Sequence, residues 1–537
     1  MGYVSKNIDH LGIVAALCKE IELVEEINKI VGVKDKQKVT TGEAVMAMVI
    51  NGLGFVNRPL YLTPEFMKNK PIELFFQKDL KPEDFNDDTM DRALDRLFEK
   101  NPTSIFMHIA LKTAKKFGIE RKFLHLDTTT MSVQGEYEFE DSDMVPIKIT
   151  NGRAKNKRYD LNQFVISLLT SSHADFPLWM SVLSGNASDK KHFREVIQEF
   201  SKELSESDGD TYFVMDSAMY TEPNIKAMSP LVKWISRVPE TITEAKKVIE
   251  ETRIEEMIKS NAEGYFFKDF SSSYAGVNQK WLVVFSEKGY EREIKTLNKN
   301  IETEMEKTKK ELWHFMNDEF NCLEDGLSQL NTKIENLKYH KVIQTGVEEI
   351  NKTGKKGRPK KEERGFKKVY KIKVDFERNE AKIECEKNKK GKFIIASNDP
   401  KLDSNEALKE YKGQQSVERG FRFLKDPLFF ASSVFLKKPE RIVSLGMIMV
   451  LSLLVYSVAQ FKLRKALEEN KESIPDQLGK PTMKPTMRRV FQMFDGITLL
   501  IILENDVEKI AGMLNLNEIQ RKILALLGGD YEKMYLC

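Results

Sequence analysis

Cysteine and histidine are scarce in this chain, which has four cysteines and seven histidines among 537 residues. The cysteines, Cys18, Cys322, Cys385 and Cys537, show no paired spacing. This pattern argues against a zinc site and against a disulfide framework, and it favours a reducing compartment. We therefore expect a cytoplasmic protein.

An excess of charge of one sign is also lacking. The 85 Lys and Arg residues are nearly balanced by 82 Asp and Glu residues, so the formal net charge is only +3. Phosphate contacts need Lys and Arg side chains that are clustered in space, and they do not need a positive net charge of the whole chain. A nucleic-acid partner therefore stays open, provided that positive charge is concentrated locally. A chain of this length, with 41% hydrophobic residues, should form roughly two to four domains with buried cores.

Only one hydrophobic run, Ile442–Ala459, approaches the length of a membrane-spanning helix. It contains Gly446 and three serines and stands alone in a charged chain. We interpret it as a buried core helix and expect no membrane partner. The N-terminal residues contain an early acid, Asp9, and do not follow the pattern of a signal peptide.

The first 118 residues are predicted to be helical throughout. The segment TTGEAVMAM begins at Thr40, which is suited to capping a helix, and Asn86 and Asp87 are candidate caps of a second one. Arg92 and Arg96 lie one turn apart on that second helix. Two interpretations stay open for this pair, solvated surface residues or phosphate contacts.

The spacing of apolar residues along the chain changes after residue 118. Between 119 and 240, the runs KFLHLDTTTMSV, DLNQFVISLLTSS, FPLWMSVLSG and TYFVMDSAMY are short and rich in β-branched or aromatic residues. Helical patterns alternate with the later runs. This order predicts an α/β fold, with a mixed sheet flanked by helices.

Residues 241–405 interrupt this alternation of strand and helix patterns. A long charged stretch, residues 291–337, has apolar residues at roughly heptad spacing and predicts a helical hairpin or short coiled coil. Strand-like pieces lie on both sides of it. The basic stretch 351–365, NKTGKKGRPKKEERG, is predicted to be an unfolded linker, and Gly357-Arg358-Pro359 is similar to the core of an AT-hook. A solvated basic loop is the alternative. Helical patterns resume at 406, and residues 466–537 are predicted to be a helical C-terminal region.

Two acids each end an apolar run. Asp127 closes FLHLD, and Asp216 closes YFVMD. Each could begin a turn, but two strand-end carboxylates in one sheet would lie side by side if their strands are neighbours. Side-by-side carboxylates repel each other unless a cation is present. A pair of Mg²⁺ ions about 4 Å apart removes that conflict and suits phosphoryl displacement.

A third acid, Glu418, lies in YKGQQSVERGFRFLK among cations and aromatics. If this stretch is one helix, Tyr411, Gln414 and Glu418 share a face, with Lys425 two turns further along. A carboxylate beside cationic groups fits an acid that binds metal next to phosphate. A surface helix with internal ion pairs is the alternative.

These residues resemble a known family. Tyr411, Glu418 and Lys425 are similar to the Y-(2)-R-(3)-E-(6)-K signature of insertion-sequence DDE transposases, the Y-R-E-K superfamily. The arginine of the signature is replaced by Gln414, and Arg419 or Arg422 is the candidate to make its phosphate contact. The segments 183–193, 213–220 and 234–241 resemble further motifs of the family in the same order.

The segment GRAKNKRYDLNQFVISLL resembles the family's basic stretch that leads into a strand. Its cations are Arg153, Lys155, Lys157 and Arg158. Together with Tyr411, Gln414, Arg419, Arg422, Lys425 and Arg358, they are the predicted DNA-binding residues. Contacts of this kind position a duplex without reading its sequence. Trp234 has two interpretations, a base-stacking residue or a core residue.

The resemblance implies an RNase H-like core in two parts, residues 119–240 and 406–465, separated by a β-rich insertion at 241–405. It implies that Asp127, Asp216 and Glu418 are catalytic and bind two Mg²⁺ or Mn²⁺ ions. The implied activity is cleavage of DNA at transposon inverted-repeat ends, followed by strand transfer into target DNA. Residues 1–118 are assigned to binding these ends.

The implied partners are double-stranded DNA, as transposon ends and target, and a second copy of the chain in a synaptic complex. The protein is then expected near the nucleoid of a prokaryotic cytoplasm. Two alternatives remain: an inactive or domesticated DNA-binding relative, and an RNase H-fold nuclease without strand transfer.

Overall fold

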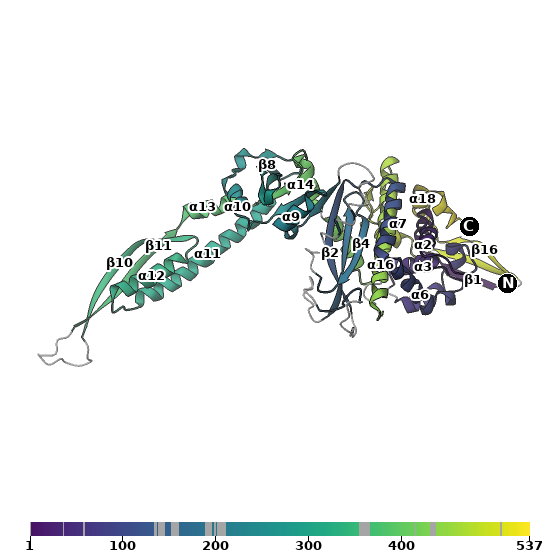
Figure 1. Cartoon of the computed structure of the whole chain (residues 1–537), viewed down its shortest axis with the longest axis horizontal. Helices are drawn as coiled ribbons and strands as arrows, with labels where there is room; N and C mark the ends of the chain where they lie inside the picture. Colours follow the sequence, from purple (N-terminus) through teal and green to yellow (C-terminus); the bar gives the residue numbers. More distant parts are fainter. Residues whose placement is uncertain are drawn as a thin grey trace. The chain divides into compact units, whose positions relative to one another are not determined.

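The computed structural model (Figure 1) describes residues 2–35, 37–56, 59–133, 137, 145–151, 161–187, 196–197, 200, 211–353, 366–413, 415–429, 436–504 and 507–536. The chain divides into two compact units. The core unit comprises Met1–Ser236, Ala275–Val277 and Leu408–Cys537. The insertion unit comprises Arg237–Tyr274 and Asn278–Ala407.

The N-terminal part of the core unit is mostly helical, as predicted. Its described α-helices are α1 (Leu11–Glu20), α2 (Leu23–Val31), α3 (Thr41–Leu53), α4 (Thr63–Met67), α5 (Ile72–Phe76), α6 (Asp87–Glu99) and α7 (Pro102–Phe117). Of the three candidate caps, Thr40 and Asn86 are confirmed, whereas Asp87 is the first residue of α6. The Thr40 hydroxyl accepts a hydrogen bond from Glu43 N at 3.2 Å, and Asn86 Oδ1 accepts one from Thr89 N at 3.0 Å. These bonds satisfy N–H groups that a helix start leaves without partners.

The prediction of helix throughout both ends of the chain is wrong. β1 (Gly2–Asn7) and β16 (Val507–Leu514) pair antiparallel with β15 (Thr498–Glu504) in a small sheet. Leu499 and Ile501 of β15 are buried. Strand pairing depends on a partner, and here the partners lie at opposite ends of the chain. A local pattern therefore does not reveal them.

The other C-terminal elements are short. They are β13 (Ile474–Pro475), β14 (Pro481–Thr482), α17 (Met487–Met493), α18 (Glu518–Leu527) and α19 (Gly529–Lys533).

A mixed sheet forms the centre of the core unit. Its strands are β2 (Phe123–Val133), β3 (Asn162–Ser171), β4 (Phe176–Ser184), β5 (Tyr212–Met215) and β6 (Lys233–Val238). They lie in the order β4-β3-β2-β5-β6. β2, β3 and β4 are antiparallel neighbours, whereas β5 is parallel to β2 and β6 is parallel to β5. The parallel pair β5 and β6 is connected through α9 (Glu222–Met228). This is the RNase H-like topology that the resemblance implied.

The long apolar helix α16 (Pro439–Glu469) lies within the core unit. It contacts β4 and helices α3, α6 and α7, and 89% of its most apolar window is buried. Length and composition alone would allow this helix to cross a membrane. Its burial instead confirms the prediction of a core helix.

The insertion unit contains an antiparallel set of strands. In order, they are β12 (Lys392–Ser397), β9 (Gln279–Ser286), β8 (Tyr265–Ser272) and β7 (Ile258–Lys259). Helices α10 (Thr243–Glu251) and α13 (Glu380–Lys389) accompany them. The strand-like pieces predicted before the charged helix are therefore confirmed, as is Lys392–Ser397 after it. The prediction is wrong for Glu380–Lys389, which forms the helix α13.

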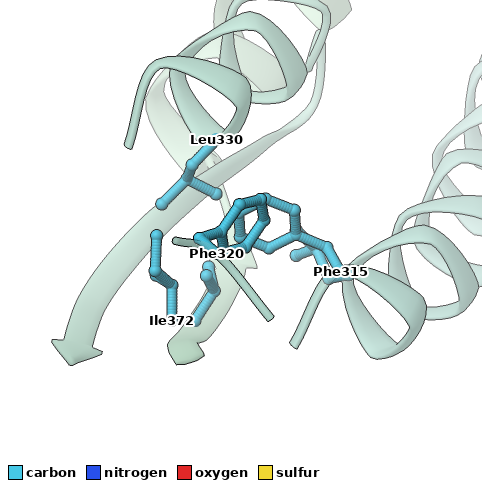
Figure 2. Packing of buried hydrophobic residues seen from close by; sticks show 6 residues of the cluster. Phe315, Phe320, Leu330 and Ile372 are labelled. Atoms are coloured by element: carbon cyan, nitrogen blue, oxygen red, sulfur yellow. The ribbon is translucent and has the colours of Figure 1, made fainter. Parts of the chain in front are cut away.

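The predicted long helix is α11 (Glu287–Asn317), which is followed by α12 (Leu323–Glu335). Both helices pack on a hairpin of β10 (His340–Thr353) and β11 (Phe366–Arg378). Phe315, Phe320, Leu330 and Ile372 form part of the shared core (Figure 2). Apolar positions of α11 therefore face a β-hairpin as well as another helix.

The basic stretch lies between the two strands of this hairpin. Its first three residues, 351–353, belong to β10 and pair with residues 366–368 of β11, so the prediction that they are an unfolded linker is wrong. Residues 354–365, which include Gly357-Arg358-Pro359, lie outside the described residues. The unfolded linker, the AT-hook and the solvated loop therefore stay predictions there.

Trp234 is a core residue. Its side chain is 0% exposed, its Nε1 donates a hydrogen bond to Ser229 Oγ at 3.1 Å, and its ring meets that of Tyr220 edge to face. We expect Trp234→Ala to lower the free energy of unfolding by about 3–5 kcal/mol. Trp234→Phe keeps most of the packing and should cost about 1 kcal/mol. Urea unfolding of both variants checks this, and near-equal effects would contradict a packing role for the indole ring.

Glu26 makes stability dependent on pH. Hydrogen bonds from Lys112 at 2.7 Å and His108 at 2.6 Å lower the pKa of this carboxyl to about 2. Because the folded-state pKa is depressed, this stabilisation is complete above about pH 4.5 and is lost as the pH falls towards 2. Lys112 and His108 are 40% and 48% exposed, so solvent screening limits the contribution to about 1–2 kcal/mol. The difference between the unfolding free energies measured at pH 7 and at pH 3 should therefore be smaller in Glu26→Gln than in the wild type.

Candidate active site

Two of the predicted catalytic acids lie on neighbouring parallel strands. Asp127 lies inside β2, which continues to Val133, so the expectation that this acid ends a strand is wrong. Asp216 directly follows Met215, the last residue of β5, as expected. His125 is paired with Val214, and extending this register by two residues places Asp127 opposite Asp216. Neighbouring strands lie about 4.8 Å apart, and paired residues point to the same face. The sheet therefore brings these two carboxylates to one face.

The chain just after β5 holds Asp216 in place. Asp216 caps the short helix η3 (Ser217–Met219), and its Oδ1 accepts a hydrogen bond from Ser217 N at 2.6 Å. Its main-chain oxygen accepts another from Ser236 Oγ of β6 at 3.3 Å. Asp216 is exposed and Asp127 is half-buried. Both carboxylates therefore remain accessible to a ligand.

The third acid comes from a helix that covers the same face. α15 (Gln415–Leu424) packs against β2 and β3. A Cβ atom placed on Gly420 would lie 3.9 Å from Leu168 Cδ1. Leu168 is the cross-strand partner of Asp127, so both side chains point to the face that α15 covers. Glu418 lies two residues before Gly420 and is exposed.

The three acids do not form a closed ligand set. Across the described ranges, no group of three or more His, Cys, Asp or Glu side chains is arranged to hold a metal ion. Accessible carboxylate oxygens are nevertheless the ligands that Mg²⁺ takes, and it usually keeps several waters. Like charges repel each other without a cation. The donor chemistry of Asp127, Asp216 and Glu418 therefore fits divalent ions.

The signature residues do not share one helix. α14 (Ser404–Lys412) ends before Gly413, and α15 begins at Gln415. Glycine is a poor helix former, and Gly413 N bonds back to Lys409 O and Glu410 O. Tyr411 therefore belongs to α14, and the prediction that it shares a helical face with Glu418 is wrong.

Arg419 is bound to an acid of the core unit. Its guanidinium donates two hydrogen bonds to Asp175, at 2.7 and 2.6 Å, which raise the pKa of Arg419. This pair ties α15 to the turn between β3 and β4. Arg422 and Lys425 are exposed, whereas Tyr411 is half-buried. The predicted DNA-binding residues Arg153, Lys155, Lys157, Arg158, Arg358 and Gln414 lie outside the described residues.

One buried polar residue beside the site was not predicted. His125 is 1% exposed, and neither ring nitrogen has a hydrogen-bond partner among the described residues. Burial lowers the pKa of His125 to about 4, so the imidazole is neutral at pH 7. It lies two residues before Asp127 on the same face of β2. The sequence could have revealed this residue, because a histidine inside the apolar run FLHLD is expected to be buried in a strand.

Residues 119–455 match the family model described as the transposase DDE domain. This range includes both strands that bear the aspartates and the helix that bears Glu418. The chain belongs to the DDE transposase family. Membership implies DNA transposition by an enzyme that uses divalent metal ions. Residues 3–111 match a second family, described as a domain of unknown function (DUF4277).

No curated protein matches the chain. Among solved structures, it is similar to a chain of a complex described as the cryo-EM structure of a piggyBac transposase synaptic complex with hairpin DNA. The sequence identity is 11% and the TM-score is 0.38, over 92% of this chain and 82% of the other.

Proposed function

We propose that this transposase cleaves DNA at the ends of a mobile element and joins the freed 3′-OH to target DNA. The observation that carries the proposal is the register of β2 and β5, which sets Asp127 opposite Asp216 under the helix of Glu418. Two acids opposite each other at one face of the sheet are better explained by a role in phosphoryl transfer than by two Asp residues that each begin an unrelated turn.

In this proposal Asp127, Asp216 and Glu418 hold two Mg²⁺ or Mn²⁺ ions. When bound, such ions lower the pKa of a water or hydroxyl nucleophile and stabilise the leaving oxygen. The carboxylates supply the negative charge that positions the ions. The Asp216 main chain, tied to β6 through Ser236, keeps one carboxylate fixed while DNA enters.

The DNA contacts are assigned to cations near these acids. Arg422 and Lys425 follow Glu418 on and just after α15, and their exposure leaves them accessible to phosphate. Arg153, Lys155, Lys157, Arg158 and Arg358 complete the proposed set, together with Tyr411, Gln414 and Arg419. A second copy of the chain would engage the other DNA end.

Strand transfer separates the proposal from a nuclease of the same fold. The substrate is linear DNA that carries the inverted repeats flanking the gene, pre-nicked to expose a 3′-OH. With purified protein and Mg²⁺, we expect this end to become covalently joined to a plasmid, as detected by gel electrophoresis and sequencing of the junctions. Hydrolysis of unprocessed ends without joining would favour the nuclease, and binding without either reaction would favour an inactive relative.

A further inference from the structure

A cavity of about 520 Å³ lies within the core unit, beside α15. Its walls come from α15 and α16, from Phe55 two residues after α3, from the turn between β3 and β4, and from the start of α17. The charged residues that line it are four arginines and two aspartates: Arg419, Arg422, Arg464, Arg488, Asp175 and Asp426. Cations therefore outnumber anions in this small volume.

The two aspartates do not neutralise all four arginines. Asp175 is occupied by the bidentate pair with Arg419. Asp426 Oδ2 lies 3.4 Å from Arg488 Nη1. Arg422 makes no hydrogen bond or ion pair with any residue that the structure describes. An anionic ligand would balance the remaining positive charge.

Two of the arginines are partly removed from water. Arg464 donates from Nε to Pro485 O at 2.8 Å, and burial lowers its pKa. Arg488 Nη1 is buried, and its 3.4 Å contact with Asp426 Oδ2 is an ion pair without hydrogen-bond geometry. A buried donor that lacks a well-aligned acceptor costs free energy, and a bound ligand that accepts its hydrogen bond would reduce that cost. Phosphate oxygens are suitable acceptors for these donors.

Aromatic side chains form another part of the wall: Phe55, Phe423 and Tyr456. All three are half-buried. The rings of Phe423 and Tyr456 lie 4.9 Å apart, and the Arg488 guanidinium lies 3.8 Å from the Phe55 ring centroid. Phe55 has a φ of 53°, a left-handed conformation that costs a non-glycine residue free energy. The fold therefore keeps a strained aromatic residue at this cavity.

We propose that this arginine pocket binds one nucleotide unit, with its phosphate held by Arg422, Arg464 and Arg488 and its base against Phe423 and Tyr456. The volume is within the range of small-ligand sites, roughly 300–1,000 Å³. Bases stack on aromatic rings whatever their sequence. The unit comes either from a free nucleotide or from an unpaired nucleotide of a DNA strand, and the DNA source rests on the proposed function.

Calorimetric titration of the full-length protein in EDTA tests the pocket without DNA cleavage. The ligands are dAMP, inorganic phosphate, a fully paired duplex, and the same duplex with one unpaired adenosine. We expect dAMP to bind at least tenfold more tightly than phosphate, because phosphate lacks the base. Arg464→Gln and Arg422→Gln should each weaken dAMP binding at least tenfold. Arg521→Gln, which changes an exposed arginine of α18, should leave it unchanged.

Arg422 is exposed, so its variant should fold even if Arg464→Gln does not; thermal unfolding checks this. Absence of dAMP binding, or equal affinity in a folded Arg422→Gln variant, overturns the proposal. Equal affinities for phosphate and dAMP overturn it as well, because the aromatic wall would then contribute nothing. A tenfold preference for the unpaired adenosine that is lost in Arg422→Gln assigns the unit to DNA, whereas no preference assigns it to a free nucleotide.

The two proposals fail separately. DNA-end joining by a protein that does not bind dAMP rejects only the nucleotide pocket. Binding of dAMP by a protein that neither cleaves nor joins ends rejects only the proposed function.

Discussion

Asp127→Asn is expected to reduce Mg²⁺-dependent end cleavage at least about a thousandfold, and Asp216→Asn and Glu418→Gln should do the same. Each substitution keeps the size of the side chain but removes a negative charge, from β2, from the end of β5 or from α15 respectively. The proposed ions would then lose a ligand at the step where charge develops. Cleavage of end-labelled DNA under single-turnover conditions measures the effect.

Glu222→Gln is the matched control. Glu222 is an exposed acid at the start of α9, close in sequence to Asp216, and it pairs with Lys226. We expect no more than a twofold change in cleavage for this variant. Titration with Mn²⁺ gives a second readout, since the three active-site variants should bind it more weakly than the control. An active-site variant that cleaves at the wild-type rate would remove that residue from the catalytic assignment.

Gly446→Val is expected to destabilise the core unit by about 3 kcal/mol. A Cβ atom on Gly446 would lie 2.4 Å from Val182 Cγ2, too close for any real contact. Val182 is a β-branched residue of β4 with a stiff side chain. Helix α16 would have to move away from β4, and the apolar contacts between them would open.

Hydrogen exchange followed by mass spectrometry measures this effect locally, which matters because a chain with two units need not unfold in one step. Peptides of α16 and β4 should exchange faster in Gly446→Val, while those of α11 and β11 should not change. Gly529→Ala is the control, because no atom lies within 4 Å of a Cβ placed there. Unchanged protection of β4 in Gly446→Val would show that the core accommodates the extra methyl groups by other movements.

Local chemistry determined much of the fold that the sequence predicted. Helix caps such as Thr40 and Asn86 act within four residues, and the β-branched and aromatic runs that form strands such as β2 and β5 span only a few residues more. The charged helix α11 and the buried helix α16 were likewise visible from periodicity and composition. Asp127, Asp216 and Glu418 were identified as unusual because each breaks the pattern of its own neighbours, and the family motif connected them.

Contacts between distant segments determined the rest. The register that sets Asp127 opposite Asp216, the docking of α15 over Leu168, and the bond from Arg419 to Asp175 all join residues far apart in the chain. The pairing of β1 with β15 and the hairpin that surrounds residues 354–365 have the same origin. Even the break at Gly413 separates a motif that looks continuous in sequence. Local propensity states which elements form, whereas packing free energy, summed over the whole core, decides which of them meet.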